Sequence, residues 1–408
     1  MLQGIHLQQD LDKAVQDLGF TEFTEIQKKT IPLIQEGKDV IAQSHTGSGK
    51  TAAFGFPIIE KTIHGQGIQA LILVPTRELC EQVNSEMHKF AKYKRLNILA
   101  VYGGVSINPQ IDKLNMTDIV VGTPGRILDH IQRKTIILNK VNILVLDEAD
   151  KMFEMGFIDD VKRIISYLKE NRQTLLFSAT ISSQVHHIVR NYMKNPLMIK
   201  VKSYVDEGKL IQHYYNVPGK DKFSLLAHLL KKDTGLTMIF CATRRMVDVL
   251  SRNLHHLGIQ SGKLHGGLSQ NKRKESIDMF HAHKFSILIA SDVAARGLDI
   301  KNVSHIINYD IPKTSNEYIH RIGRTARAGT EGKVISLLSE SDHDNFRRVL
   351  EDRSLVVQKL EMPEFEKIPL IKLGRMADEE RPRYQSNRSH EHSRSRGPRR
   401  FVKKNFRR

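Results

Sequence analysis

The sequence predicts two α/β domains in tandem followed by a disordered basic tail, and three observations lead to this fold class. Apolar runs of strand length alternate with helical stretches in two successive series, as in parallel sheets that helices cover on both faces. A charged, glycine-containing segment separates the series, and 40% of the 408 residues are hydrophobic, which is enough for two packed cores. We place the first domain at residues 1–200, a linker at 201–212, the second domain at 213–360 and the tail at 361–408.

Short apolar runs in each domain are expected to be buried strands. The run 39–42 precedes a glycine-bearing loop, and the run 141–146 is continuously apolar, as is typical of a central parallel strand. The other runs are 70–74, 98–101, 118–122 and 174–177 in the first domain, and 237–241, 286–290, 303–308 and 333–338 in the second. Because open α/β sheets bind ligands beyond the carboxyl ends of their strands, the loops after these runs are the expected places for a site.

The loop after the run 39–42 has the composition of a phosphate-binding loop, with a serine where the first glycine is usual. Its glycines let backbone N–H groups point inward, and the start of a helix adds unpaired N–H groups that face an anion. We expect Lys50 to reach the β- and γ-phosphates from a solvent-facing position and the Thr51 hydroxyl to complete a Mg²⁺ shell. A Gly/Ser turn that caps a helix is the alternative. The predicted nucleotide-binding residues here are Ser44, His45, Thr46, Gly47, Ser48, Gly49, Lys50 and Thr51.

Two carboxylates follow the continuous apolar run 141–146. Asp147 and Glu148 come at the carboxyl end of this predicted strand. Asp147 is the candidate for holding Mg²⁺ through water, and Glu148 for orienting and polarising the attacking water. A solvated acidic turn before a helix is the alternative. Together with a phosphate loop, these carboxylates predict hydrolysis of a nucleoside triphosphate with Mg²⁺ as cofactor.

A third cluster lies in the second domain. His320, Arg324 and Arg327 are spaced at i, i+4 and i+7, so they share one face if the segment is helical. Guanidinium groups neutralise the charge that builds on a transferring phosphoryl group, and these would reach the phosphates across a cleft between the domains. Hydrolysis would then depend on closure of that cleft. A basic, solvated helix is the alternative.

These clusters, with others between them, resemble the motifs of the DEAD-box RNA helicases of helicase superfamily 2. The match runs from about residue 2 to about residue 350 and keeps the family's order and spacing. The resemblance implies two RecA-like domains that flank a cleft for ATP and RNA. The matching motifs are Pro75-Thr76-Arg77-Glu78-Leu79, Gly103-Gly104, Thr123-Pro124-Gly125-Arg126, Asp147-Glu148-Ala149-Asp150, Ser178-Ala179-Thr180, residues 291–299 and residues 320–327.

The resemblance also implies roles around the nucleotide. Gln27 matches the glutamine that distinguishes adenine through a paired donor and acceptor, and Phe20, at the start of the same segment, is expected to belong to the nucleotide site as well. Asp299 matches the carboxylate that contacts the ATP ribose, and Arg324 and Arg327 match arginine fingers. The residues expected to couple the DEAD segment to RNA-dependent closure are Asp150, Ser178, Thr180, His320 and Arg321.

RNA is expected to be held by its sugar-phosphate backbone, without recognition of sequence. This task needs cations, hydroxyls and glycines that let the protein backbone approach phosphate, and the 2′-OH would select RNA over DNA. The positions that match the family are Arg77, Gly104, Thr123 and Arg126 in the first domain, and Thr243, Arg244, Gly266, Arg273 and Ser291 in the second.

Composition agrees with this interpretation. The formal net charge of +18 points to a polyanionic partner, and the Arg- and Ser-rich tail has too few aliphatic residues to fold, so we expect it to contact RNA phosphates. A solubilising tail without a specific role is the alternative.

The two cysteines, Cys80 and Cys241, provide neither metal-ligand spacing nor a disulfide framework. No apolar run approaches the length of a membrane span, so a cytoplasmic protein is expected.

The predicted function is that of an ATP-dependent RNA helicase. ATP binding and hydrolysis would be coupled to non-processive, local unwinding or remodelling of RNA duplexes and ribonucleoproteins, because both ligands select a closed state that bends one strand. Two alternatives stay open. One is a translocating or DNA-directed helicase of the same superfamily, and the other is a non-enzymatic RNA clamp or annealing chaperone that acts through the tail.

Overall fold

The computed structural model describes residues 4–44, 48–201, 210–232, 235–295, 300, 303–325, 331–353 and 355–371. Several predicted features lie outside these ranges: His45, Thr46, Gly47, Asp299, Arg327, residues 202–209 of the linker and the tail from residue 372 onward. Among the helices of the described part, none is both long and apolar enough to cross a membrane.

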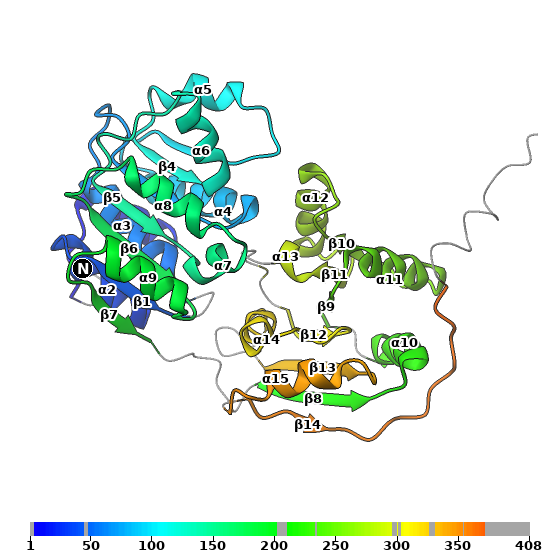
Figure 1. Cartoon of the computed structure of the whole chain (residues 1–408). Helices are drawn as coiled ribbons and strands as arrows, with labels where there is room; N and C mark the ends of the chain where they lie inside the picture. The colour runs from blue at the N-terminus through cyan, green and yellow to red at the C-terminus, as the bar shows by residue number, and fades with distance from the viewer. Residues whose placement is uncertain are drawn as a thin grey trace, which may run out of the picture. The chain divides into compact units, whose positions relative to one another are not determined.

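The first domain is built around a sheet of seven parallel strands in the order β3-β4-β2-β5-β6-β1-β7 (Figure 1). The strands are β1 (Val40–Gln43), β2 (Ala70–Leu73), β3 (Ile98–Val101), β4 (Ile119–Gly122), β5 (Ile143–Leu146), β6 (Gln173–Ser178) and β7 (Leu197–Lys200). The helices are α1 (Gln9–Asp17), α2 (Glu25–Gln35), α3 (Lys50–Lys61), α4 (Arg77–Phe90), α5 (Asn108–Leu114), α6 (Pro124–Gln132), α7 (Ala149–Glu154), α8 (Ile158–Ser166) and α9 (Ser183–Tyr192). Strands β2, β4 and β5 are buried along their whole length, as their continuous apolar runs predict.

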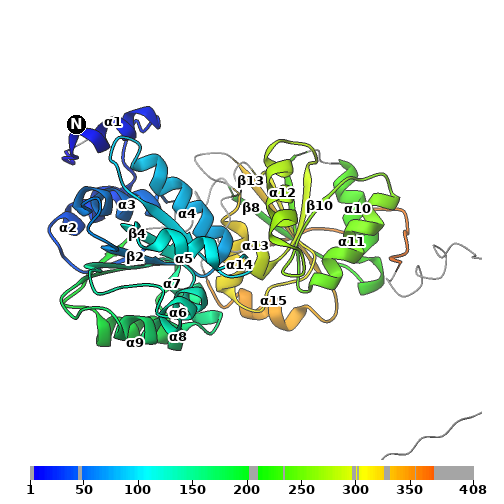
Figure 2. The same cartoon turned by 90° about the horizontal axis from the view of Figure 1, so that it is seen from above.

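Alternation along the strands sends side chains into two separate cores. In β2, Ala70 and Ile72 belong to one hydrophobic cluster, whereas Leu71 and Leu73 belong to another. Helices α1 to α4 supply side chains to the first cluster and α6 to α9 to the second, so the two groups cover opposite faces of the sheet (Figure 2). The predicted parallel sheet with helices on both faces is therefore confirmed for this domain.

The second domain repeats this architecture with a sheet of seven parallel strands in the order β10-β11-β9-β12-β13-β8-β14. The strands are β8 (Leu210–Asn216), β9 (Thr237–Cys241), β10 (Gly262–Leu264), β11 (Ile287–Ser291), β12 (His305–Asn308), β13 (Gly332–Leu338) and β14 (Gln358–Lys359). The helical elements are the short 3₁₀ turn η1 (Gly219–Asp221), α10 (Lys222–Lys232), α11 (Arg244–His256), α12 (Gln270–His281), α13 (Asp292–Ala295), α14 (Ser315–Ile322) and α15 (His343–Val349). Helices α10 and α11 cover one face of the sheet, and α12, α14 and α15 cover the other (Figure 2).

The C-terminal end of the second domain continues further than the sequence indicated. Residues 355–371, which we call the strap, include β14, which pairs with β8, and then continue along the domain (Figure 1). Phe365, Ile368 and Leu370 pack against the core beneath α10, and Ile368 exchanges two hydrogen bonds of 2.9 and 3.0 Å with the Ser224 hydroxyl. The sequence placed the tail from residue 361, but the apolar residues spaced along 361–371 bury themselves against the domain instead.

All the strand pairs are parallel, so the carboxyl ends within a sheet meet at one edge. In the first sheet β5, β6 and β1 are neighbours, and they end directly before residues 147–150, 179–180 and 44–51. In the second sheet, β9 ends two residues before Thr243, and Ser291 is the last residue of β11. Segments that are distant in the sequence are therefore collected at the edges where ligands bind.

Candidate functional site

The described part of the phosphate loop joins β1 to the N-terminus of α3. Ser44 N–H donates to the carbonyl of Ser178 (3.0 Å), and the Ser48 hydroxyl donates to that of Ser44 (3.0 Å). Gly49 caps α3 with a φ of 89°, a conformation that favours glycine over any residue with a Cβ. The loop therefore enters the helix at Lys50, and the first N–H groups of α3 follow the turn, as predicted.

Lys50 differs from the prediction because it does not face solvent. Its side chain is only 7% exposed, and its ammonium donates to the carbonyl of Ser44 (3.3 Å). Its charge also acts on two carboxylates at the end of β5, where it favours the ionised forms of Asp147 and Glu148. Lys50 thus stabilises buried negative charge in the protein itself, a role that the motif alone did not reveal.

Asp147 and Glu148 are both buried at the end of β5. Burial raises the pKa of Asp147 to about 6, although Lys50 opposes the shift. Asp147 accepts a hydrogen bond from Glu148 N–H (2.9 Å), and Glu148 adopts a left-handed backbone conformation with a φ of 48° and a ψ of 48°. The turn after β5 therefore holds two carboxylates side by side in a low-dielectric environment.

Lys151 is a residue of this site that sequence reasoning missed. Its ammonium lies 2.8 Å from Oε1 of Glu148, and both side chains are almost fully buried. Burial acts to raise the pKa of Glu148, but Lys151 and Lys50 outweigh it, so this pKa lies below its usual value. Burial in turn lowers the pKa of Lys151. The i, i+3 spacing of the pair was the available sequence signal.

Asp150 joins the ends of β5 and β6. Its Oδ2 accepts from Ala179 N–H (3.1 Å) and from both the N–H (2.8 Å) and the hydroxyl (3.0 Å) of Thr180. The Ser178 hydroxyl accepts from Asp150 N–H (3.2 Å) and donates to the carbonyl of Thr180 (2.7 Å). The three predicted coupling residues of this domain are therefore brought together in one network.

Gln27 lies against the phosphate loop. Its Oε1 accepts from Thr24 N–H (2.9 Å), which makes a capping box at the start of α2, and its Nε2 donates to the carbonyl of Gly49 (3.0 Å). Because an amide oxygen has two lone pairs and an amide nitrogen has two protons, one acceptor and one donor of Gln27 are not used by these bonds. Phe20 packs edge-to-face on Phe56, with 5.7 Å between the ring centroids.

The arginine segment departs from the prediction of one shared helical face. Helix α14 ends at Ile322, and Gly323 forms its C-cap, so Arg324 lies in a turn after the helix that carries His320. Both His320 and Arg324 are buried. Arg324 also contributes to the low pKa of Glu148, after the larger effects of burial and of the lysines. Because the helix ends before Arg324, the i, i+4 spacing of His320 and Arg324 does not correspond to one helical face here.

Arg321 is bonded within its own domain. Its guanidinium makes a bidentate ion pair with Asp292 (2.6 and 2.7 Å) and donates to Asn308 Oδ1 (2.9 Å) and the carbonyl of Asp310 (2.6 Å). The Phe240 ring lies 5.0 Å from the guanidinium carbon. We expected Arg321 to reach toward the DEAD segment, but these bonds connect α14 to the ends of β11 and β12. Four N–H donors are occupied in this way, and the buried charge is compensated locally.

The predicted RNA-binding residues of the first domain surround the turn after β3. Arg77 begins α4, and its guanidinium lies against Gly104, so a Cβ at that position would displace the end of the Arg77 side chain. Gly104 has a φ of 85°, a backbone conformation that favours glycine. Arg126 donates to the carbonyl of Val105 (3.0 Å), while Thr123 is the residue that precedes α6.

The corresponding residues of the second domain lie on several turns. Thr243 caps α11 by accepting from Met246 N–H (3.1 Å), and Arg244 follows it with an exposed side chain. Gly266 is in the turn after β10, and Ser291 is buried at the end of β11. Arg273 of α12 forms an ion pair with Glu78 of α4, with 2.7 Å between Nη1 and Oε1.

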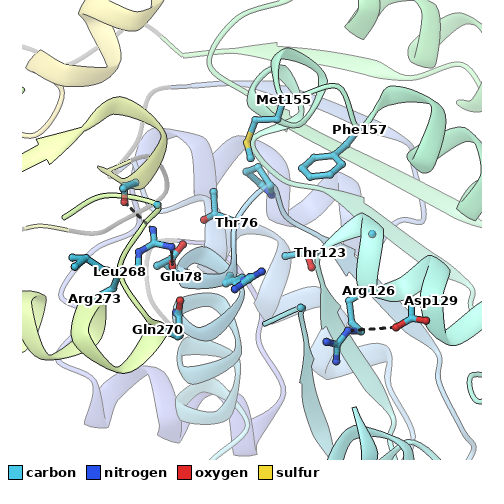
Figure 3. A pocket seen from close by; sticks show the side chains of 16 residues that line it. Thr76, Glu78, Thr123, Arg126, Asp129, Met155, Phe157, Leu268, Gln270 and Arg273 are labelled. Atoms are coloured by element: carbon cyan, nitrogen blue, oxygen red, sulfur yellow. Dashed lines mark hydrogen bonds and ion pairs between the residues drawn. The ribbon is translucent and has the colours of Figure 1, made fainter. Parts of the chain in front are cut away.

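A pocket of about 490 Å³ collects several of these residues (Figure 3). Five of the nine predicted RNA-binding residues contribute to its lining, and Gly104, Thr243, Arg244 and Ser291 do not. The five are Arg77, Thr123, Arg126, Gly266 and Arg273. Three arginines face two carboxylates here, and Figure 3 shows the Arg273–Glu78 and Arg126–Asp129 pairs. The lining is suited to an anionic backbone that competes with these carboxylates for the guanidinium groups.

In the first domain, the phosphate loop lies at the same sheet edge as the carboxylates that follow β5. The second domain, also built on a parallel sheet, carries the arginine segment. This combination defines a two-domain nucleoside triphosphatase of the P-loop class. Family models identify the group within this class: the one described as DEAD/DEAH box helicase matches residues 24–188, and the one described as helicase conserved C-terminal domain matches residues 221–329. The chain belongs to the DEAD-box ATP-dependent RNA helicase family.

Similar proteins and structures support this assignment. The chain is 46% identical over 361 residues to the ATP-dependent RNA helicase CshA of Listeria monocytogenes, covering 88% of this chain and 69% of that protein. It is 43% identical over 365 residues to CshA of Geobacillus kaustophilus, covering 88% and 78%. These relatives confirm the family that the motifs predicted.

Solved structures of the family confirm two tandem RecA-like domains. Dbp5 of S. cerevisiae, bound to RNA and ADP BeF3, is similar with a TM-score of 0.78 and 30% identity, over 87% of this chain and 94% of that chain. A DEAD box protein from the hyperthermophile Methanococcus jannaschii is similar with a TM-score of 0.54 and 40% identity, over 88% and 98%.

Proposed function

We propose that this chain uses ATP binding and hydrolysis to separate short stretches of RNA duplex locally and without processive movement. The observation that carries the proposal is the adjacency of β5, β6 and β1, whose carboxyl ends bring the DEAD carboxylates, the Ser-Ala-Thr segment and the phosphate loop to one edge. Because adjacent parallel strands end at the same edge of the sheet, an ATPase site and its coupling segment would be neighbours there. Relatives that are named ATP-dependent RNA helicases support RNA as the substrate.

The nucleotide is assigned to the phosphate loop and its neighbours. Residues 44–51 would surround the phosphates with N–H groups, and Lys50 would turn its ammonium from the Ser44 carbonyl toward the β- and γ-phosphates. The unused donor and acceptor of Gln27 suit the edge of adenine. Asp299 would contact the ribose.

The donor set at the end of β5 fits Mg²⁺. Asp147 is a buried carboxylate, and the Thr51 hydroxyl is in the first turn of α3, so both offer hard oxygen atoms. Mg²⁺ sites in phosphoryl-transfer enzymes use one or two carboxylates together with substrate phosphates, which matches a site that has few protein ligands. When bound, the ion would neutralise negative charge on the phosphates.

Glu148 and the arginine segment would provide the chemistry. Glu148 is kept ionised by Lys151 and Lys50, and it would orient the attacking water. Arg324 and Arg327 would neutralise charge on the γ-phosphate, with His320 beside them. One hydrogen-bond network joins Asp150, Ser178 and Thr180. These three residues would transmit RNA binding to the neighbouring carboxylates. Arg321 would act indirectly, by fixing α14 to β11 and β12.

ATPase assays with nucleic acids test the proposal. Steady-state phosphate release is measured without nucleic acid, with single-stranded RNA and with single-stranded DNA of the same sequence. We expect stimulation by RNA and little by DNA, and ATP-dependent separation of an RNA duplex whose rate falls steeply with duplex length. Equal stimulation by DNA would favour a DNA-directed helicase, and turnover that does not respond to RNA would exclude coupling.

A second prediction concerns the basic tail beyond the described residues. Deletion of residues 375–408 is expected to weaken RNA binding and flatten its salt dependence, because each neutralised phosphate contributes about −0.7 to the slope of log K against log salt. If about five cations of the tail engage phosphates together, the slope falls by about 3 to 4. Turnover at saturating RNA should be preserved. An unchanged slope would mean that the tail serves solubility instead.

A further inference from the structure

Arg126, assigned above to RNA, is held from several sides. Its Nη2 donates to the carbonyl of Val105 (3.0 Å) and its Nη1 to Oε1 of Gln110 (3.3 Å). Asp129, one turn further along α6, places Oδ2 3.8 Å from Nε. Only 11% of the Arg126 side chain is exposed, so its direction is set by these partners rather than by solvent.

Gln110 is the least obvious of these partners, because it lies on a different helix, α5, and is buried. Its Nε2 donates to the carbonyl of Tyr102 (3.1 Å), while its Oε1 faces both Arg126 and Nε2 of His130 (3.1 Å). A flipped amide would set oxygen against the Tyr102 carbonyl and NH₂ against a guanidinium that can only donate. The orientation of the Gln110 amide is therefore fixed by its surroundings.

His130 completes the arrangement. Because Oε1 of Gln110 can only accept, Nε2 of His130 carries the proton, and Nδ1 is free to accept from the Thr135 hydroxyl (2.8 Å). The imidazole is completely buried, and burial followed by the charge of Arg126 lowers its pKa, so the neutral ring persists at neutral pH. A single tautomer of His130 thus donates to the same Gln110 oxygen that accepts from Arg126.

We propose that Gln110 is a positioning residue for RNA binding, which directs the guanidinium of Arg126 to the turn at residues 103–105 where an RNA phosphate would lie. The inference rests on the proposed function, since it requires Arg126 to contact RNA. Gln110 itself touches no phosphate. It gives Nη1 of Arg126 a neutral acceptor and adds no negative charge to that of Asp129, so that the positive charge of Arg126 remains available.

A double-mutant cycle tests this proposal in the full-length chain. The variants are Gln110→Met, which keeps the volume and removes the polar amide, Arg126→Ala and the double variant, with Gln132→Met at an exposed position of α6 as the matched control. We measure RNA affinity at several salt concentrations, the RNA concentration for half-maximal ATPase, turnover at saturating RNA, and melting temperature.

We expect Gln110→Met to weaken RNA binding by about 10-fold, the lower range for disturbing a charge-assisted contact, and to reduce the salt slope by about 0.7. The half-maximal RNA concentration should rise while turnover at saturating RNA stays unchanged. In the Arg126→Ala background, Gln110→Met should have no further effect on RNA binding, because its only route to RNA has been removed. Gln132→Met should behave like the wild type.

Two results would overturn the inference: wild-type RNA affinity in Gln110→Met, or an effect that adds fully to that of Arg126→Ala. Wild-type affinity in Arg126→Ala would instead contradict the RNA contact assigned under the proposed function. If Gln110→Met does not fold, Gln110→Glu replaces it. This carboxylate keeps the acceptor but neutralises the guanidinium, so a reduced salt slope supports the proposal and an unchanged slope opposes it.

Discussion

Lys50→Met is expected to reduce ATP turnover by on the order of 10²- to 10³-fold or more, since removing one preorganised charge-stabilising donor has effects of this size. The ammonium is the cation aimed at the β- and γ-phosphates, and methionine retains the volume of the buried chain without its charge. Because Lys50 is buried and not solvent-facing, methionine is a better replacement than alanine, which would leave a cavity. Phosphate release with saturating ATP and RNA measures the effect.

The stability of the same variant provides an independent check on the electrostatics. The charge of Lys50 is the main effect that opposes the burial of Asp147, whose pKa is raised to about 6. Its removal should therefore raise that pKa further and lower the melting temperature at neutral pH. Lys38→Met, at an exposed position just before β1, is the matched control and should change neither quantity. Turnover close to the wild-type value in Lys50→Met would contradict the phosphate-loop assignment.

The central strands could be predicted because they are continuous apolar runs. The run 141–146 contains β5, and the run 174–177 lies within β6. A strand that is buried on both faces is mostly apolar along its length, so it can be recognised in the sequence. The edge strands β7, β10 and β14 and the neighbouring β8 were not predicted. Side chains of β7 and β14 are largely exposed, and β8, which begins inside the predicted linker at Leu210, mixes buried and exposed positions. These strands are identified by their pairing with neighbouring strands, because their own sequences lack the apolar pattern of a buried strand.

The site was predictable where its residues are contiguous in sequence. The phosphate loop and the DEAD tetrad are short motifs that follow strands, so their place at the sheet edge follows from the topology. Gln110 and His130 were missed because their importance comes from contacts between α5 and α6, which no spacing reveals. Lys151 was missed for another reason: a lysine beside an acidic cluster is usually solvated, and only the packing of α7 buries it.

Glu148→Gln is expected to lower turnover by about 10²- to 10⁴-fold, the usual contribution of a general base, while ATP and RNA binding are preserved. Glutamine keeps the shape and an acceptor oxygen but cannot polarise the attacking water. With hydrolysis blocked, the state that holds both ligands cannot be reset, so RNA should dissociate slowly in the presence of ATP. Single-turnover phosphate release and RNA dissociation rates measure the two effects. Glu170→Gln, at an exposed position of the same domain, is the matched control.

The Glu148–Lys151 ion pair allows the chemical effect to be separated from a structural one. In Glu148→Gln the buried ammonium of Lys151 loses its charge partner, and breaking a buried pair in this way destabilises a protein by about 3–5 kcal/mol, an upper value here because glutamine can still accept a hydrogen bond. Replacing the lysine as well, in Glu148→Gln with Lys151→Met, should restore much of the melting temperature but none of the turnover. If turnover recovers together with stability, Glu148 supports the fold and a different group orients the attacking water.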